Sequence, residues 1–508
     1  MKADFVNAIN NAYSSKGLTI TLGAPMLNGE VCAGAPIKLP LSTFNRHGLI
    51  AGATGTGKTK TLQGMAEALS RQGVPSLLMD IKGDLSGLAM AGTPNPKIAE
   101  RQSKIGIEWQ PEGFPVELYS ISNEQGTRMR ATLIEFGPVL FSRILELNDI
   151  QSGVVAMVFK YCDDAGMPLL DLKDFRKTLQ YLTNEGKAEV EEKYGAISKT
   201  TTSTIIRKIL EIEQQGAEMF FGERSFEVND LLRSDPRGRG YINIVRLTDI
   251  QDRPKLFSTF MLCLLDEIYA TFPESGDLEK PRLVIFIDEA HLVFEEASKS
   301  LLNQIEMVIK LIRSKGVGVF FCTQQPTDVP ADILSQLGLK VQHALRAFTA
   351  NDRKNIKSVA ENYPLSDFYK TEDLLTALGI GEALVTGLNE KGIPTPLAQV
   401  MLCAPRSRMD VLSEKEMESL VNDSPLAKKY NEEIDRESAF EILTQKLKGI
   451  TPASELKNQK PEREQHEKTI LEEVAGSALG RQVMRSFTQE VTRSLLGVLG
   501  IGYTRKRR

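Results

Sequence analysis

The fold is decided by Gly52-Ala53-Thr54-Gly55-Thr56-Gly57-Lys58-Thr59, which matches the phosphate-binding pattern G-x-x-x-x-G-K-[ST]. An apolar segment, residues 48–51, precedes this stretch, and a segment with helical periodicity, residues 61–69, follows it. The pattern requires this strand–loop–helix context. The alternative interpretation is a flexible glycine turn before an ordinary helix. The pattern and its flanks together predict a binding site for a nucleoside triphosphate.

Each part of this loop has an expected role. The glycines let backbone N–H groups turn inward around the phosphates, and the helix N-terminus adds partial positive charge. Lys58 is expected to reach the β- and γ-phosphates of ATP, and the Thr59 hydroxyl to ligate Mg²⁺. No base-recognition motif is legible in the sequence, so ATP and GTP are not distinguished at this point. The residues expected to bind the nucleotide are Gly52, Ala53, Thr54, Gly55, Thr56, Gly57, Lys58, Thr59 and Lys60.

A second motif concerns hydrolysis. Residues 283–287 form a continuous apolar run, which is typical of a strand buried on both faces of a parallel sheet. The run ends in Asp288 and Glu289, where ligands sit in open α/β sheets. Asp288 is expected to hold Mg²⁺ through its water shell, and Glu289 to orient and deprotonate the attacking water. The alternative is that both acids only cap the following helix.

A third motif follows at the next expected strand, residues 316–322. An amide side chain at the tip of this strand can donate a hydrogen bond to the γ-phosphate or to the attacking water. Gln324 is favoured for this role over Gln325. The alternative is a polar turn that only ends the strand, because Pro326 cannot continue a ladder of hydrogen bonds.

The composition predicts a soluble cytoplasmic protein. Of 508 residues, 25% are charged and 41% are hydrophobic, and the formal net charge is −4, so any nucleic-acid surface must be local. The five cysteines form no C-x-x-C pair, which suits buried thiols in a reducing compartment. The N-terminus shows no secretory signal, and no apolar run approaches the 18 residues of a membrane span.

The spacing of the motifs predicts an α/β fold: a P-loop NTPase core with a mainly parallel sheet, an all-helical insertion and a helical C-terminal extension. The insertion is inferred because the gap between Thr59 and Asp288 is much longer than a minimal core needs, and most of it shows helical periodicity. The expected parts are an α/β lead-in (1–46), the first part of the core (47–126), the insertion (127–236), the second part of the core (237–404) and the extension (405–508).

Further elements follow from hydrophobic periodicity. Strands are expected at 18–22, 75–80, 116–119, 241–245, 341–345, 382–386 and 397–402, and helices within 141–147, 154–161, 175–182, 205–212 and 256–269. In the extension, residues 449–465 are expected to form a solvated linker and residues 469–499 a helix. The basic tail, residues 503–508, is either a solvated end or a contact to nucleic acid.

Taken together, these motifs resemble the HerA/FtsK branch of P-loop ATPases, and specifically the soluble bacterial HerA-like proteins that carry a helicase HerA-like C-terminal domain. The resemblance covers most of residues 40–405. The matching segments are residues 46–59, 80–84, 286–291, 311–324 and 341–348. The phosphate-binding loop is generic, whereas the last two segments are more diagnostic.

The resemblance implies a RecA-like sheet, a homo-oligomeric hexameric ring, and a DNA translocase or helicase-like motor acting on double-stranded DNA. It also implies that an arginine from the neighbouring subunit completes each nucleotide site. Arg346 and Arg353 are the catalytic candidates, and Arg313 is a candidate for coupling the site to the interface. An arginine in this region is alternatively a surface ion pair. Relatives are expected to carry arginine near position 340, where Lys340 lacks the planar fork.

One departure limits what the resemblance implies. About 46 residues precede the strand before the phosphate-binding loop, which leaves room for neither the N-terminal β-barrel that docks a nuclease nor membrane helices. Whether a nuclease or another protein binds this chain therefore stays open. Two rival functions also stay open: an ATP-dependent oligomeric switch or scaffold that regulates a partner protein without translocating DNA, and a motor that acts on protein.

Overall fold

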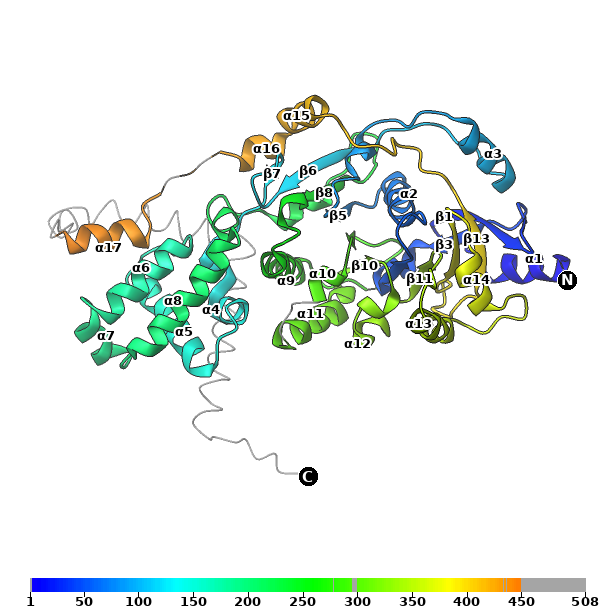
Figure 1. Cartoon of the computed structure of the whole chain (residues 1–508). Coiled ribbons are helices and arrows are strands. Elements are labelled where there is room, and N and C mark those ends of the chain that lie inside the picture. Colours follow the sequence, from blue (N-terminus) through cyan, green and yellow to red (C-terminus); the bar gives the residue numbers. More distant parts are fainter. Residues whose placement is uncertain (1, 277, 295–298, 433, 435, 449–508) are drawn as a thin grey trace, which may run out of the picture.

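The structure is a computed structural model that describes residues 2–276, 278–294, 299–432, 434 and 436–448. Its centre is a 13-stranded mixed sheet with helices on both faces (Figure 1). The α/β class and the mainly parallel sheet expected from the sequence are confirmed. The expected linker at 449–465, the helix at 469–499 and the basic tail at 503–508 lie outside the described residues.

Eight neighbouring strands run parallel to one another. Most of them are buried along their whole length, which explains why the sequence shows continuous apolar runs there instead of alternation. In spatial order they are β11 (Leu339–Gln342), β4 (Gly48–Ala51), β10 (Val317–Thr323), β9 (Leu283–Ile287), β5 (Ser76–Asp80), β8 (Ile242–Arg246), β6 (Val116–Ser120) and β7 (Thr127–Arg128).

Antiparallel strands continue the sheet beyond β11. They are β12 (Glu382–Thr386), β13 (Ala398–Leu402), β1 (Thr19–Leu27), β2 (Glu30–Val31) and β3 (Ile37–Pro40). The strand expected at 341–345 is β11, which ends at Gln342 because its partner β4 ends at Ala51. Beyond that point the chain crosses the phosphate-binding loop, where the Ala53 amide donates to the Ala344 carbonyl at 2.8 Å.

The two faces of the sheet are covered by different helices because alternate strand residues point to opposite sides. Ile50 belongs to the hydrophobic cluster that includes α2 (Lys58–Arg71), and Leu49 belongs to the cluster that includes α9 (Pro254–Thr271) and α11 (Lys299–Ile312). The segment expected as a helix at 256–269 is α9. The helix that begins at the phosphate-binding loop therefore lies on the face opposite α9.

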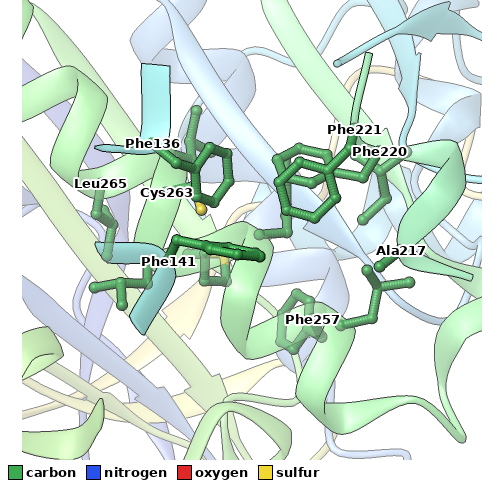
Figure 2. Close-up of a cluster of buried hydrophobic side chains, with 14 of the residues drawn as sticks. Phe136, Phe141, Ala217, Phe220, Phe221, Phe257, Cys263 and Leu265 are labelled. Atoms are coloured by element: carbon green, nitrogen blue, oxygen red, sulfur yellow. The ribbon is translucent and has the colours of Figure 1, made fainter. Parts of the chain in front are cut away.

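Five helices, which fall within the expected insertion, gather away from α1 in Figure 1. They are α4 (Leu133–Ile144), α5 (Asp149–Asp164), α6 (Leu172–Thr183), α7 (Lys187–Lys193) and α8 (Lys199–Gln214). Figure 2 shows Phe136, Phe141, Phe220 and Phe221 of this region packed with Phe257 of α9. The rings of Phe136 and Phe221 are 4.9 Å apart between centroids, so an aromatic cluster fastens these helices to the core.

The remaining helices of the described residues are α1 (Lys2–Ala12), α3 (Pro96–Ile105), α10 (His291–Phe294), α12 (Ala331–Leu334), α13 (Ala350–Glu361), α14 (Thr371–Ala377), α15 (Glu414–Asp423), α16 (Pro425–Tyr430) and α17 (Ala439–Leu447). The chain after β13 runs back along the molecule, and α17 packs on α6. Within the described ranges, no helix combines the length and the apolar character needed to cross a membrane.

Candidate functional site

Three neighbouring strands bring the predicted motifs to one edge of the sheet. β10 lies between β4 and β9, with Thr323 opposite Ala51 and Phe321 opposite Ile287. The phosphate-binding loop follows β4, Gln324 follows β10 and Asp288 follows β9. Parallel strands end at the same edge, so three segments far apart in the sequence meet there.

The phosphate-binding loop has the backbone geometry that its glycines allow. Gly52, Gly55 and Gly57 have φ values of 155°, 79° and 110°, which L-residues rarely adopt. Within the described part of the chain, the amides of Gly55, Gly57, Lys58 and Thr59 donate to no protein acceptor. The Lys58 ammonium folds back over the loop and donates to the Gly52 carbonyl at 2.6 Å. The loop thus presents a group of unpartnered amides and one cation to an anion.

A buried histidine supports the loop from behind. The His343 amide donates to the Ala51 carbonyl at 2.7 Å, and its Nε2 lies 2.9 Å from the Thr61 hydroxyl on α2. A Cβ atom on Gly52 would lie 2.4 Å from the His343 Cβ, so only glycine fits there. Burial lowers the pKa of His343 to about 4, and the charge of Lys58 acts in the same direction. The histidine is therefore neutral and acts as part of the scaffold.

Three residues at the end of the loop carry cationic or polar side chains. Burial lowers the pKa of the Lys58 ammonium, and the carboxylates of Glu289 and Asp288 oppose this shift, which places these three groups in one electrostatic site. Thr59 is partly exposed, and its hydroxyl has no hydrogen-bond partner among the described residues. The ammonium of Lys60 donates instead to the Met409 carbonyl at 2.5 Å and to the Gln63 Oε1 at 3.2 Å.

Asp288 is the residue whose surroundings fit a metal ion. Its side chain is 3% exposed, and its Oδ2 atom has no hydrogen-bond partner in the described residues. Burial, and then the neighbouring charge of Glu289, raises the pKa of Asp288 to about 6. A buried carboxylate oxygen without a partner and the free hydroxyl of Thr59 are oxygen ligands suited to Mg²⁺. The residues present therefore fit a Mg²⁺ ion held between protein and phosphate.

Glu289 is held differently from Asp288. Its backbone has a φ of 45°, an unusual value for a residue other than glycine, and its Oε1 forms an ion pair with Lys82. The Nε2 of Gln324 lies 3.5 Å from the Glu289 Oε2, and the His291 Nδ1 lies 3.3 Å from the same atom. Burial disfavours the carboxylate, but hydrogen bonding and charge from Lys82 outweigh it and lower the pKa of Glu289. The carboxylate is therefore ionised and able to accept a proton.

The two glutamines at the tip of β10 have different contacts. Gln324 faces Glu289, whereas the side chain of Gln325 caps the short helical turn Pro326–Asp328. The Gln325 amide also donates to the Asp328 Oδ2 at 2.9 Å. This geometry favours Gln324, as the sequence did, for contact with a phosphate or water.

Sequence reasoning missed Lys82 and His291, and it gave His343 no role. Lys82 lies in the charged segment 80–84 that follows β5, which the sequence analysis singled out without assigning a partner. β5 pairs directly with β9, and this neighbour relation is what brings Lys82 to Glu289. Asp80 itself accepts bonds from three backbone amides and shapes this segment.

The arginine candidates lie in two places. Arg346 and Arg353 are exposed, in the segment after β11 and on α13 respectively. Arg313 precedes β10 and so lies at the opposite edge of the sheet from the loop. There it lines a pocket of about 550 Å³ together with Arg46, Lys310 and Lys340. The described residues that line this pocket include no aspartate or glutamate, although the chain as a whole is acidic.

A family model described as Helicase HerA-like C-terminal matches residues 26–494. The DNA double-strand break repair helicase HerA of Sulfolobus acidocaldarius is 24% identical over 385 residues, which cover 71% of this chain and 66% of that protein. The protein of the same name from Saccharolobus solfataricus is 24% identical over 365 residues, which cover 69% of this chain and 63% of that protein. The chain thus spans about two thirds of the length of these curated relatives.

Solved structures share the fold. The bacterial conjugative coupling protein TrwBdeltaN70 in its trigonal form with sulphate aligns with a TM-score of 0.53 at 16% identity, covering 80% of this chain and 95% of that one. Its unbound monoclinic form aligns with a TM-score of 0.51 at 17% identity, covering 80% and 94%. The likeness extends over nearly the whole of that protein and concerns the fold alone.

Proposed function

This chain belongs to the helicase HerA-like C-terminal family of P-loop ATPases, and on that premise we propose that it is a Mg²⁺-dependent ATP hydrolase that drives movement along double-stranded DNA. One observation carries the proposal. Unpartnered loop amides and a buried, unpartnered carboxylate oxygen of Asp288 lie at the ends of strands separated only by β10. Such a pair of features suits a triphosphate and its metal ion.

We assign each residue one task in hydrolysis. The amides of Gly55, Gly57, Lys58 and Thr59 and the Lys58 ammonium bind the phosphates, for which Lys58 must leave the Gly52 carbonyl. Thr59 and Asp288 hold Mg²⁺, which when bound neutralises phosphate charge. Glu289 accepts the proton of the attacking water, because its carboxylate is ionised at neutral pH. The amide of Gln324 orients that water or the γ-phosphate.

We further propose that the chain assembles into a ring, in which ATP turnover by one subunit depends on a residue of its neighbour. The names of the curated relatives, DNA repair helicases, support DNA as the track. A cation from a neighbouring subunit stabilises charge on the transferring phosphoryl group in such assemblies. Arg346 and Arg353 remain the predicted donors, and the basic pocket with Arg313 is a second candidate surface for this contact. The two candidate surfaces are distinguished by mixing Lys58→Ala subunits with subunits altered at one surface or the other. Each variant alone lacks activity, and mixing restores ATP turnover only where the altered surface acts on the nucleotide of a neighbouring subunit.

The proposed organisation follows from these assignments. Residues 47–126 and 237–404 supply the nucleotide-binding core, residues 127–236 form the helical insertion, and residues 405–508 form the extension, behind a lead-in of residues 1–46. The segment after β13 contacts α2 through Glu67, which accepts hydrogen bonds from the Arg406 and Ser407 amides. The extension is therefore in a position to sense movement of the helix that carries the phosphate-binding loop.

The central experiment measures ATP turnover of the full-length protein with Mg²⁺. Glu289→Gln is expected to reduce turnover by at least about 100-fold while leaving ATP binding intact, because it removes the proton acceptor. Glu185→Gln, which alters an exposed glutamate on the insertion, is the matched control and should match the wild type. A wild-type rate equal to that of buffer would reject the motor and favour the switch or scaffold.

DNA dependence is tested separately. Double-stranded DNA is expected to raise the ATPase rate at low salt, and the increase should fall steeply as salt rises, because phosphate contacts release counterions. An ATPase rate that is unchanged by both single- and double-stranded DNA at low salt would favour a motor acting on protein.

A further inference from the structure

A groove of about 400 Å³ begins beside the phosphate-binding loop and runs along α2. Its first lining residues on α2 are Lys60 and Thr61, directly after the residues expected to hold phosphate and metal. The opposite wall comes from β1, from the end of β13 and from the segment that ends α3. A molecule held by its phosphates in the loop therefore has this groove as a neighbouring space.

Hydrogen bonds tie the walls of the groove to the loop. The Gly381 amide donates to the Thr56 carbonyl at 3.0 Å, and the Leu402 amide donates to the Gly381 carbonyl at 3.0 Å. The Arg101 guanidinium donates to the carbonyls of Gly381 and Leu402 at 3.1 and 3.2 Å. Leu402 lines the groove, and so does Gln102, the neighbour of Arg101. The groove and the phosphate-binding loop are thus parts of one bonded unit.

The lining of the groove suits a flat ring with hydrogen-bonding edges. Trp109 is half-buried, and its Nε1 donates to the Pro405 carbonyl at 2.9 Å, which fixes the plane of the indole. Gln102 is 6% exposed, and its Oε1 atom has no hydrogen-bond partner among the described residues. The positive charges of the lining are offset by Glu67 and Glu108, in contrast to the basic pocket at the other edge of the sheet.

We infer that this groove holds the base of the nucleotide, with Trp109 against the ring and Gln102 selecting adenine over guanine. A glutamine amide pairs with adenine because it accepts from the exocyclic amine and donates to the adjacent ring nitrogen. At the edge that carries N7, guanine has a carbonyl oxygen in place of that amine, so neither orientation of the Gln102 amide can form a hydrogen bond to both atoms. The inference rests on the proposed nucleotide site and names its base specificity, for which the sequence holds no motif.

The only tryptophan of the chain, Trp109, makes the inference directly measurable in the full-length protein. ADP is expected to change the tryptophan fluorescence on binding, because the base contacts the indole. Inorganic tripolyphosphate is expected to compete with ADP while leaving the fluorescence unchanged, because it occupies only the loop. GDP should bind roughly tenfold more weakly than ADP or worse, the range of one base-specific amide contact.

Gln102→Leu should reduce the preference for ADP over GDP to about twofold or less, while tripolyphosphate affinity stays at the wild-type value. Gln180→Leu, the same change at an exposed position on α6, is the matched control. Wild-type protein that binds ADP and GDP equally, or that binds ADP with unchanged fluorescence, overturns the inference and leaves the nucleotide site standing. Protein that binds neither ADP nor tripolyphosphate overturns both.

Discussion

Replacing Asp288 by asparagine should stabilise the protein in the absence of nucleotide. The Asp288 carboxyl is buried, and its Oδ2 has no hydrogen-bond partner in the described residues. Burial and the charge of Glu289 raise its pKa from 3.8 to about 6. Ionisation of this group therefore lowers the free energy of unfolding. Asparagine removes the charge and nearly keeps the shape of the side chain.

The size of the effect follows from the pKa shift. The difference between a pKa of 3.8 and one of about 6 corresponds to at most about 3 kcal/mol at 1.36 kcal/mol per pKa unit. The folded carboxyl holds its proton up to a higher pH than the unfolded one, so stability falls as pH rises from about 4 to about 6. The stabilisation by Asn should thus be largest above pH 7 and roughly half as large at pH 5.

Thermal unfolding of wild type and variant, each at pH 5 and pH 7.5, measures this difference. For a chain of 508 residues, about 1–3 kcal/mol corresponds to a rise in Tm of roughly 1–3 °C at pH 7.5. Asp80→Asn is the contrasting control. Burial, and then the charge of Asp84, raises the pKa of Asp80 to about 7. Unlike Asp288, however, the Asp80 carboxylate accepts hydrogen bonds from three backbone amides. Its replacement should destabilise the protein, because one amide would face an NH₂ group.

Two results would contradict this prediction. One is an Asp288→Asn protein that is no more stable than wild type at pH 7.5, and the other is a gain that is equal at both pH values. The Asp288→Asn variant should also lose the ability to bind Mg²⁺ together with the nucleotide. Mg²⁺ with ADP should raise the Tm of wild type more than ADP alone does, whereas the variant should show no added effect of Mg²⁺.

Two further changes test the scaffold of the site. Gly52→Ala brings a Cβ atom to 2.4 Å from the His343 Cβ at a φ of 155°, so it should cost about 1–3 kcal/mol of stability and at least tenfold in ADP affinity by fluorescence titration. Gly153→Ala on α5, where the added Cβ meets nothing within 4 Å, is the control and should be neutral or stabilising. Lys82→Met removes the partner that lowers the pKa of Glu289, so the acid limb of the kcat/KM profile should move to higher pH. An unmoved limb would exclude Glu289 as the group that titrates there.

The parts of the site that are contiguous in the chain were predictable from the sequence. The segment expected as a helix at 61–69 is α2, and the strand expected at 382–386 has these bounds in β12. A strand, its loop and its helix carry their own pattern of apolar residues, glycines and polar residues. Parallel strands also end at a common edge, so the meeting of Asp288 with the phosphate-binding loop followed without knowledge of the strand order.

The contacts that depend on strand order were not predictable from one sequence. Lys82 reaches Glu289 because β5 pairs with β9, and the segment between these strands in the chain contains the three strands β6–β8 and the five helices α4–α8. The pocket that contains Arg46 and Lys340 is formed in the same way, from residues that periodicity treats as ordinary surface charges. The groove that contains Trp109 and Gln102 depends on how the chain after β13 returns across α2.

The short strand β4 connects the basic pocket to the nucleotide site. Arg46 lines the basic pocket just before β4 begins at Gly48, and the phosphate-binding loop starts just after β4 ends at Ala51. At about 3.3 Å per residue, the segment from Arg46 to Gly52 spans roughly 20 Å, so one buried strand carries the basic pocket at one end and the nucleotide site at the other. Copies packed head to tail would bring the basic pocket of one against the phosphates held by the next, a heterologous contact that closes into a ring when its rotation permits. Because the pocket of one copy would contact the phosphates held by the next copy, we expect a charge change at Arg46 to alter ATP turnover in the assembled protein while leaving the ADP affinity of isolated subunits unchanged.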